Sequence, residues 1–427
     1  MKKYCLGLAV AGVLAGVGPA AGRAQGVSAE SAKAAIAAGV AGTAGVGEKG
    51  DSATFYLHKF AQNIGKETFY RTMSDSGVSY AVHFRFVDRG QPVPLEARLV
   101  VTPDYEPISL WLKGKTCRFC TISDSVVIAG STAAIRVDDS SFSRTVKGPT
   151  FPVGGYSPGT VQMALLQYWR KHGRPTHLSL LPTGSVTIRQ AGNDTLSQYG
   201  QRLLLERFVI SGLIWGNELV WTDPQGNLIC LITNDAEGDK LEMMLDRYEF
   251  FLPYLIGRAA SYGMELFADE MKGEDKHANA GALGQPGTLA IVGGNMIDVA
   301  TGQTTTNATI LIHNGRITKA GPSAGIPVPA GAKVIHAEGK IILPGLWDMH
   351  AHFEQAEWGP AYLAAGVTTV RDCGNEFNYI NSVKTAIDDG TGIGPHILKA
   401  GIIDGPGPMG LGVIRASTQQ EAIAAVR

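Results

Sequence analysis

The sequence predicts two architectures in one chain: a β-rich N-terminal domain, built as a curved antiparallel sheet or half-barrel, and then an α/β part. Short runs of alternating apolar and polar residues dominate residues 51–234, and strong turn signals such as the DPQGN run at 223–227 separate them. Beyond residue 340, strand patterns alternate with helix patterns. The 427 residues correspond to two or three domains of about 150 residues each.

The first 24 residues have the three-part layout of a secretory signal peptide. Two lysines precede an uncharged apolar run from Cys5 to Val17, and small residues stand at Gly22 and Ala24. The run is too short to span a membrane. We expect cleavage near Ala24, a flexible leader over residues 25–50, and export to the periplasm or the outside. A buried N-terminal helix is the alternative.

The net charge excludes two classes of partner. The chain has 37 basic and 38 acidic residues, which give a formal charge of -1. No summed field therefore favours nucleic acid or an anionic membrane surface. No stretch after the leader reaches about 18 apolar residues without a charge, so we expect no membrane span after cleavage.

Four cysteines remain after the predicted cleavage, and Cys117 and Cys120 among them form a CxxC pair. A redox dithiol needs such a pair at a helix N-terminus, and a zinc site needs a second pair. The flanking residues have strand patterns with a turn between them. A structural disulfide across the turn and two thiols are therefore the favoured alternatives, and the disulfide state stays open.

The β-rich domain is expected to cover residues 51–271 and to contain two helices. The first begins with Ser157 as cap and Pro158 at the first helical position, and it runs to Gly173. The second is longer, from about Leu241 to Met271, with a kink at Pro253.

A linker is expected at residues 272–287, where the sequence KGEDKHANAGALGQPG is charged, small and turn-forming. A small β layer follows over residues 288–340. Its expected strands are Leu289–Val292, Thr309–His313, Arg316–Ala320 and Lys333–His336.

The candidate chemistry lies in the next strand. Asp348, His350 and His352 are two residues apart from one another, so on a strand all three point to the same face. Two imidazoles on one face can hold one divalent metal ion. His350 and His352 are therefore candidate metal ligands, and two surface histidines that share a strand by chance are the alternative.

Three segments of the sequence resemble one family. The run NMIDVATGQTTTNATILIHNGRITKAG, the motif LPGLWDMHAH and the later AAGVTTVRDCGN occur in this order, and together they resemble the amidohydrolase superfamily of metal-dependent hydrolases. The likeness covers residues 288–427 and is greatest to the imidazolonepropionase-like and Xaa-Pro-dipeptidase-like branch. It implies a β-sandwich subdomain over 288–340 and a TIM-like (β/α)8 barrel from 341 onward.

The resemblance also implies a reaction. His350 and His352 take the place of the first-strand ligands of one or two divalent ions, most often zinc. A metal-activated water then attacks a C-N bond of an amide, a cyclic amide or a peptide-like substrate. Which substrate is used stays open, and lactone hydrolysis is included. The family's bridging lysine and general base belong to later barrel units.

Only the first three of eight β/α units precede Arg427. We therefore expect an N-terminal fragment that is inactive alone, with the missing barrel half supplied by a continuing reading frame. Asp372, Asn375 and Asp404 follow the second and third strands and are candidate substrate-binding residues. The alternative function is an envelope module in which residues 51–271 bind a ligand or partner and the hydrolase part is a degenerate remnant.

Overall fold

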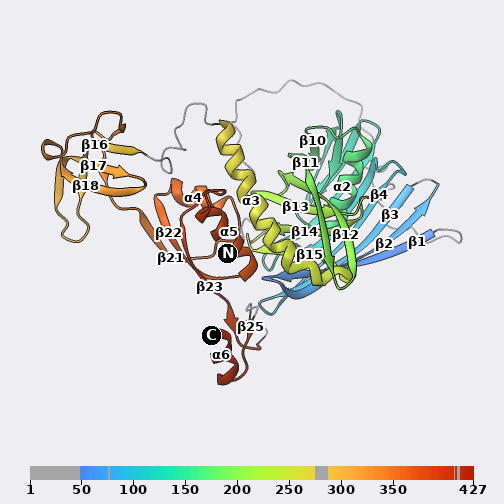
Figure 1. Ribbon diagram of the computed structural model, residues 1–427. Coiled ribbons are helices and arrows are strands. Elements are labelled where there is room, and N and C mark those ends of the chain that lie inside the picture. Colours follow the sequence, from blue (N-terminus) through green and yellow to red (C-terminus); the bar gives the residue numbers. More distant parts are fainter. Residues whose placement is uncertain (1–48, 76, 275–286, 408, 411–413) are drawn as a thin grey trace.

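The structure is a computed structural model that describes residues 49–75, 77–274, 287–407, 409–410 and 414–427 (Figure 1). The predicted signal peptide, nearly all of the predicted leader and most of the predicted linker lie outside the described residues. Within the described residues, no helix has both the length and the apolar character needed to cross a membrane.

The β-rich domain is one 15-stranded sheet. Two runs of consecutive neighbours, β8 to β1 and β15 to β9, are joined where β1 pairs with β15, and all pairs are antiparallel except β9 with β10. This arrangement confirms the predicted antiparallel sheet. The strands are β1 (Lys49–Lys59), β2 (Gln62–Ser74), β3 (Gly77–Asp88), β4 (Gln91–Val101), β5 (Pro107–Lys115), β6 (Thr121–Ala129), β7 (Thr132–Val137), β8 (Ser140–Thr145), β9 (Thr150–Pro152), β10 (Leu178–Leu181), β11 (Ser185–Gln198), β12 (Gln201–Ser211), β13 (Asn217–Thr222), β14 (Leu228–Asn234) and β15 (Lys240–Leu245).

The first helix of the domain, α2 (Gly159–Lys171), is buried over most of its length. Pro158 is its N-cap, and neither Pro158 nor Ser157 provides a side-chain cap, so the predicted cap was wrong. Glu67 of β2 replaces it: its two carboxylate oxygens accept hydrogen bonds from the backbone N–H groups of Gly159, at 2.9 Å, and Thr160, at 2.8 Å. The buried carboxylate thus satisfies N–H groups that have no partner within the helix.

The second helix of the domain begins later than the sequence predicted. Residues 240–245 form β15, a 3₁₀ helix follows at Asp246–Phe251, and α3 covers only Leu252–Glu274. The strand forms because β1 and β14 pair with it on both sides, which the local apolar spacing does not reveal. Pro253 lies in the first turn of α3, where the missing N–H of a proline costs nothing.

The predicted strand–turn–strand around the CxxC pair is confirmed. Cys117 and Cys120 lie on the turn between β5 and β6, where the Thr116 N–H donates to the carbonyl of Cys120 at 3.0 Å. Both side chains are buried, and none of the cysteines in the described part of the chain forms a disulfide. The structure therefore shows two thiols.

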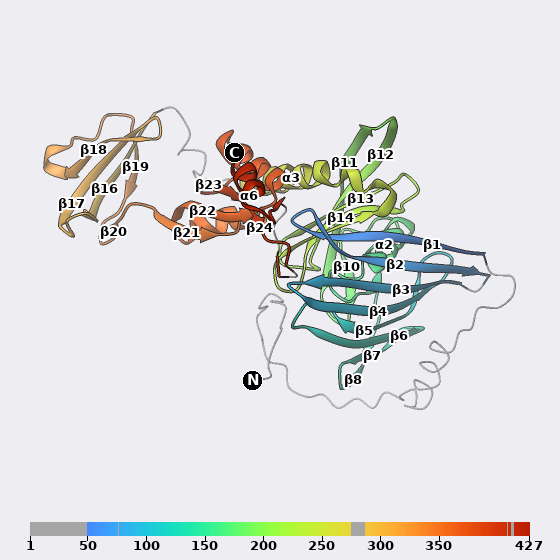
Figure 2. The ribbon, with the colours of Figure 1, turned by 90° about the horizontal axis from the view of Figure 1, so that it is seen from below.

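A separate sheet forms the β layer, and it lies at the end of the molecule away from the large sheet (Figures 1 and 2). Its order is β18-β17-β16-β19, with β20 paired to β16. All four predicted strands are present. They are β16 (Thr288–Ile297), β17 (Thr304–His313), β18 (Arg316–Pro322) and β19 (Lys333–His336). The short strand β20 (Ile341–Ile342) is additional, and a 3₁₀ turn lies at Ser323–Gly325.

The α/β part follows as parallel strands that alternate with helices, as predicted. The strands β21, β22 and β23 pair in this order, all parallel. Thr418 caps the last helix in a capping box with Glu421. The elements are β21 (Leu346–Ala351), α4 (Trp358–Ala364), β22 (Val367–Asn375), α5 (Phe377–Asp388), β23 (His396–Gly401), β24 (Ile403–Asp404), β25 (Ile414–Arg415) and α6 (Gln419–Val426).

The large sheet and the parallel strands share one hydrophobic core. Helix α3 lies between them and packs against α5 (Figure 1). Close approach is possible because α3 carries glycines at the contact: a Cβ on Gly263 would lie 3.0 Å from the Cβ of Ala356, and one on Gly257 would lie 3.2 Å from Ser382 Oγ. The β-rich domain is therefore in direct contact with the strands that carry the predicted metal ligands.

Candidate functional site

The two predicted ligands lie at the carboxyl end of β21. His350 is on the strand, and His352 follows directly after its last residue, Ala351. The two histidines are exposed whereas Ala351 is buried, which is the alternation expected at a strand end. Asp348 has a local role, because its Oδ1 accepts a 3.0 Å hydrogen bond from the His350 N–H.

The geometry of the two rings fits a shared metal ion. A tetrahedral ion with nitrogen ligands at about 2.1 Å places the centres of two ligating rings about 5 Å apart. The ring centres of His350 and His352 are 5.4 Å apart, and their planes are inclined by 62°. The spacing of the two rings is therefore compatible with one shared ion.

A backbone carbonyl selects the nitrogen that His352 can offer. Nδ1 of His352 lies 2.9 Å from the carbonyl oxygen of Gly374 in β22. This contact is a hydrogen bond when Nδ1 carries the proton, and Nε2 then has its lone pair available for a metal. Pairing of β21 with β22 brings the carbonyl to this position.

Asp372 and Asn375 are buried beneath the histidines. Asp372 Oδ2 accepts from the Phe353 N–H at 2.7 Å, and Asp372 Oδ1 accepts from the Gly374 N–H at 3.0 Å. Asn375 Nδ2 donates to the Phe353 carbonyl at 2.8 Å and to Asp372 Oδ2 at 3.1 Å. The two side chains thus fix the backbone of Phe353, the residue that directly follows His352. A direct role in substrate binding stays a prediction for both.

Asp404 lies on β24, outside the three-stranded parallel sheet. Its Oδ1 accepts a 2.8 Å hydrogen bond from the N–H of Gly405, a contact typical of turns. The structure does not bring Asp404 into contact with the two histidines, and its substrate role stays a prediction.

Sequence reasoning missed the buried charges next to the site. Glu354, two residues after His352, is buried, and burial raises its pKa. Burial lowers the pKa of Lys240 to about 8, although Glu354 and Glu242 oppose this shift. Lys240 Nζ lies over the ring of Tyr379. One signal was present in the sequence: Glu354 and Glu357 stand in the run FEQAEW, directly after the motif.

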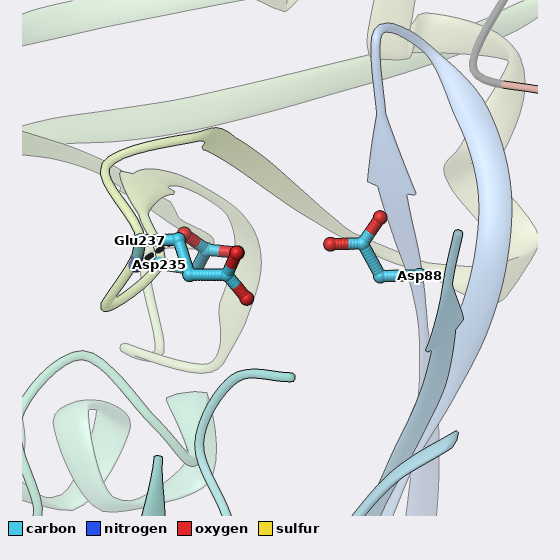
Figure 3. A group of neighbouring side chains, drawn as sticks. All are labelled: Asp88, Asp235 and Glu237. Atoms are coloured by element: carbon cyan, nitrogen blue, oxygen red, sulfur yellow. Dashed lines mark hydrogen bonds between the residues drawn. The ribbon is translucent and has the colours of Figure 1, made fainter. Parts of the chain in front are cut away.

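A carboxylate cluster in the β-rich domain does not fit a metal. Oxygens of Asp88, Asp235 and Glu237 lie within 4.8 Å of one another (Figure 3). The ammonium of Lys59 already occupies the space between two of them, at 2.7 Å from Asp88 and 2.6 Å from Asp235. The Arg118 guanidinium binds Glu237. These cations supply the charge that a metal ion would bring.

No family model matches the chain. The adenine deaminase of Paracoccus denitrificans is 38% identical to it over 82 residues, which are 19% of this chain and 14% of that protein. The 5-methylthioadenosine/S-adenosylhomocysteine deaminase of Symbiobacterium thermophilum is 42% identical over 66 residues, 15% of either chain. The chain thus spans about a seventh of the length of these relatives.

Solved structures are similar over a larger share of both chains. A molinate hydrolase is 31% identical at a TM-score of 0.28, over 29% of this chain and 32% of that one. A Xaa-Pro dipeptidase with bound methionine is 27% identical at a TM-score of 0.25, over 27% and 33%. Together with the order of the sequence motifs, the similarity to the deaminases supports a relationship of this chain to the amidohydrolase superfamily.

Proposed function

We propose that this chain carries the first-strand metal ligands of an exported amidohydrolase that cleaves a C-N bond of a small amide, cyclic amide or peptide-like substrate. One observation carries the proposal: His350 and His352 lie together at a strand end, and the Gly374 carbonyl leaves Nε2 of His352 available. When bound there, a divalent ion, most readily zinc, supplies a nucleophile from water at neutral pH and polarises the substrate carbonyl. Two of the relatives are named as deaminases, and a deamination also breaks a C-N bond.

The residues of this chain have defined tasks in that reaction. His350 and His352 bind the ion, and the Gly374 carbonyl keeps the proton of His352 on Nδ1. Asp372 and Asn375 hold the backbone at Phe353, so that the end of β21 keeps its position when an ion is bound. The exposure of both rings leaves the site open to a substrate from solvent.

Zinc binding tests the proposal. Zinc content and affinity are measured on the full chain, on His350→Ala and on His352→Ala, with His336→Ala as matched control because it removes an exposed histidine of the β layer. One bound zinc that is lost in both site variants and kept in the control supports the proposal. Absence of zinc binding, or equal binding by all four proteins, would reject it.

Export is the second part of the proposal and rests on residues 1–24. Expression in a bacterial host should give periplasmic or secreted protein that begins near Gln25, as read by N-terminal sequencing. Removal of residues 2–24 should keep the protein in the cytoplasm. Uncleaved protein in the cytoplasm of cells that express the full sequence would argue against export.

The alternative, a ligand-binding module over residues 51–271, has less support. A half-barrel that carries an apolar ligand needs space on its concave side, whereas here α2 packs in one core with the described strands. Binding of an apolar fluorescent probe by the double variant His350→Ala/His352→Ala, unchanged from the wild type, would favour this alternative.

A further inference from the structure

We propose that the β-rich domain positions the metal site by holding residues 353–357, the five residues that directly follow His352. We call these residues the post-ligand segment. The inference rests on the proposed function, because it concerns how His352 is placed for a metal. It assigns positioning roles to Glu354 of the α/β part and to Asn217 of the β-rich domain.

Three hydrogen bonds join the post-ligand segment to the large sheet. The backbone N–H of Lys240, the first residue of β15, donates to Glu354 Oε2 at 2.9 Å. At the start of β13, Asn217 donates to Glu357 Oε1 through its backbone N–H, at 2.9 Å, and through Nδ2, at 3.1 Å. Both carboxylates thus project from the α/β part onto N–H groups of the β-rich domain.

The contact between Lys240 and Glu354 is shielded from water, whereas Asn217 and Glu357 are half-buried. Glu354 is 6% exposed, and the neighbouring Phe353, Gln355 and Ala356 are buried as well. A cavity of about 40 Å³ lies along this seam, lined on one side by Asn217 and Lys240 and on the other by Glu354 and Glu357. It has room for a few water molecules at most, so the two sides remain in direct contact. A hydrogen bond in such a place constrains position more than an exposed one does.

The segment is held from the opposite side by the α/β part itself. Asp372 and Asn375 bind the N–H and the carbonyl of Phe353, the residue between His352 and Glu354. The backbone after His352 is therefore fixed between β22 and the large sheet. Since metal sites need their ligands within about 0.5 Å of the productive geometry, release of one side should loosen the site.

A purely structural role for these contacts makes a different prediction. Loss of the contacts would then lower the stability of the folded protein but leave the affinity for metal unchanged once the chain is folded. A positioning role changes the affinity in the folded protein. The conservative variant Glu354→Gln separates the two, because its amide oxygen still accepts from the Lys240 N–H while Glu354→Ala has no acceptor.

The experiment measures Zn²⁺ affinity by competition with a chelator at 20 °C, on the full chain and on folded variants checked by circular dichroism. We expect Glu354→Ala and Asn217→Asp to bind Zn²⁺ about 10- to 100-fold more weakly, as for other residues that support metal ligands. Asn217→Asp is nearly isosteric and puts a carboxylate against Glu357. Glu354→Gln, and the control Glu338→Ala on the exposed β layer, should stay within about threefold of the wild type.

Each result has one reading. Affinities of Glu354→Ala and Asn217→Asp within threefold of the wild type would overturn the inference, and so would an equal loss in Glu354→Gln, where the acceptor is retained. If Glu354→Ala does not fold, Asn217→Asp decides alone. A wild-type chain without histidine-dependent zinc binding would instead reject the proposed function, so the two failures are distinguishable.

Discussion

The backbone N–H of Phe353 donates a 2.7 Å hydrogen bond to Asp372 Oδ2. A buried carboxylate on β22 thus holds the residue that directly follows His352, the second predicted metal ligand. Asp372 is fully buried and accepts three hydrogen bonds in all. The contact links the position of the site to the pairing of β21 with β22.

Asp372→Asn should lower the stability of the protein by about 1–3 kcal/mol, because an amide nitrogen would replace one oxygen that accepts from an N–H group. Zinc affinity should fall as well. Urea unfolding measures the first effect and chelator competition the second. Asp388→Asn is the control: its exposed pair with Lys384, at 2.9 Å, should contribute less than about 0.5 kcal/mol. Equal stability of the two variants would contradict the prediction.

Glu67→Ala should destabilise the β-rich domain by about 2–3 kcal/mol, because the N–H groups of Gly159 and Thr160 would lose their acceptor in a buried place. Thermal unfolding followed by circular dichroism gives the loss. Glu96→Ala, which removes an exposed carboxylate from β4 of the same sheet, should change the unfolding temperature little. A similar shift in both variants would show that α2 needs no external cap.

Asp194→Asn should be among the most damaging single changes in the β-rich domain. Its buried carboxylate accepts from four side chains: Arg207 at 2.7 Å, Trp221 at 2.8 Å, Tyr262 at 2.8 Å and Arg258 at 3.1 Å. Removal of one partner from a buried ion pair costs about 3–5 kcal/mol. Urea unfolding should show this, whereas Asp51→Asn, which breaks the exposed pair with Arg71, should cost at most about 1 kcal/mol. Losses of equal size would refute it.

Glu218 should make stability depend on pH. Burial raises its pKa to about 7 from an ordinary 4.5, although Thr233 and Gln162 donate hydrogen bonds to it. Between these two values the folded state binds more protons than the unfolded state, so the free energy of unfolding falls as pH rises. Glu218→Gln stays neutral and should remove this slope, with a gain of at most about 3 kcal/mol at pH 8.

Urea unfolding of wild type and Glu218→Gln at pH 5, 6, 7 and 8 checks the prediction. The difference between the two proteins should grow with pH over this range and level off above pH 7. Curves that stay parallel would mean that Glu218 is ionised throughout.

The sequence was informative where a signal is local. Alternating strands, turns and the HxH motif each depend on neighbours in the chain, and they led to the correct sheet type and strand order of the α/β part. The segment Leu241–Leu245 shows the limit. Its apolar spacing fits a helix, but pairing with β1 and β14 makes it a strand. Strand partners far away in the sequence leave no trace in such a short run.

The site shows the same division. His350 and His352 were recognised from their spacing, and the structure places their rings together. The hydrogen bond from the Lys240 N–H to Glu354 joins residues 114 positions apart, and the local sequence around neither residue predicts it. Burial of Asp372 likewise follows from packing, so the sequence did not reveal its hydrogen bonds to the backbone, and its role in substrate binding stays a prediction.

The pairing of β1 with β15 has a consequence for the order of folding. The first and last strands of the large sheet lie side by side, whereas each arm consists almost entirely of hairpins between consecutive strands. Such local hairpins can form early, but the two arms cannot be joined until β15 has been synthesised, and closure of so long a loop is slow. Pulse-labelled hydrogen exchange should therefore find β3–β6 protected before β1. Because β15 also presents the Lys240 N–H to Glu354, the last strand to dock completes the surface that receives the metal strand.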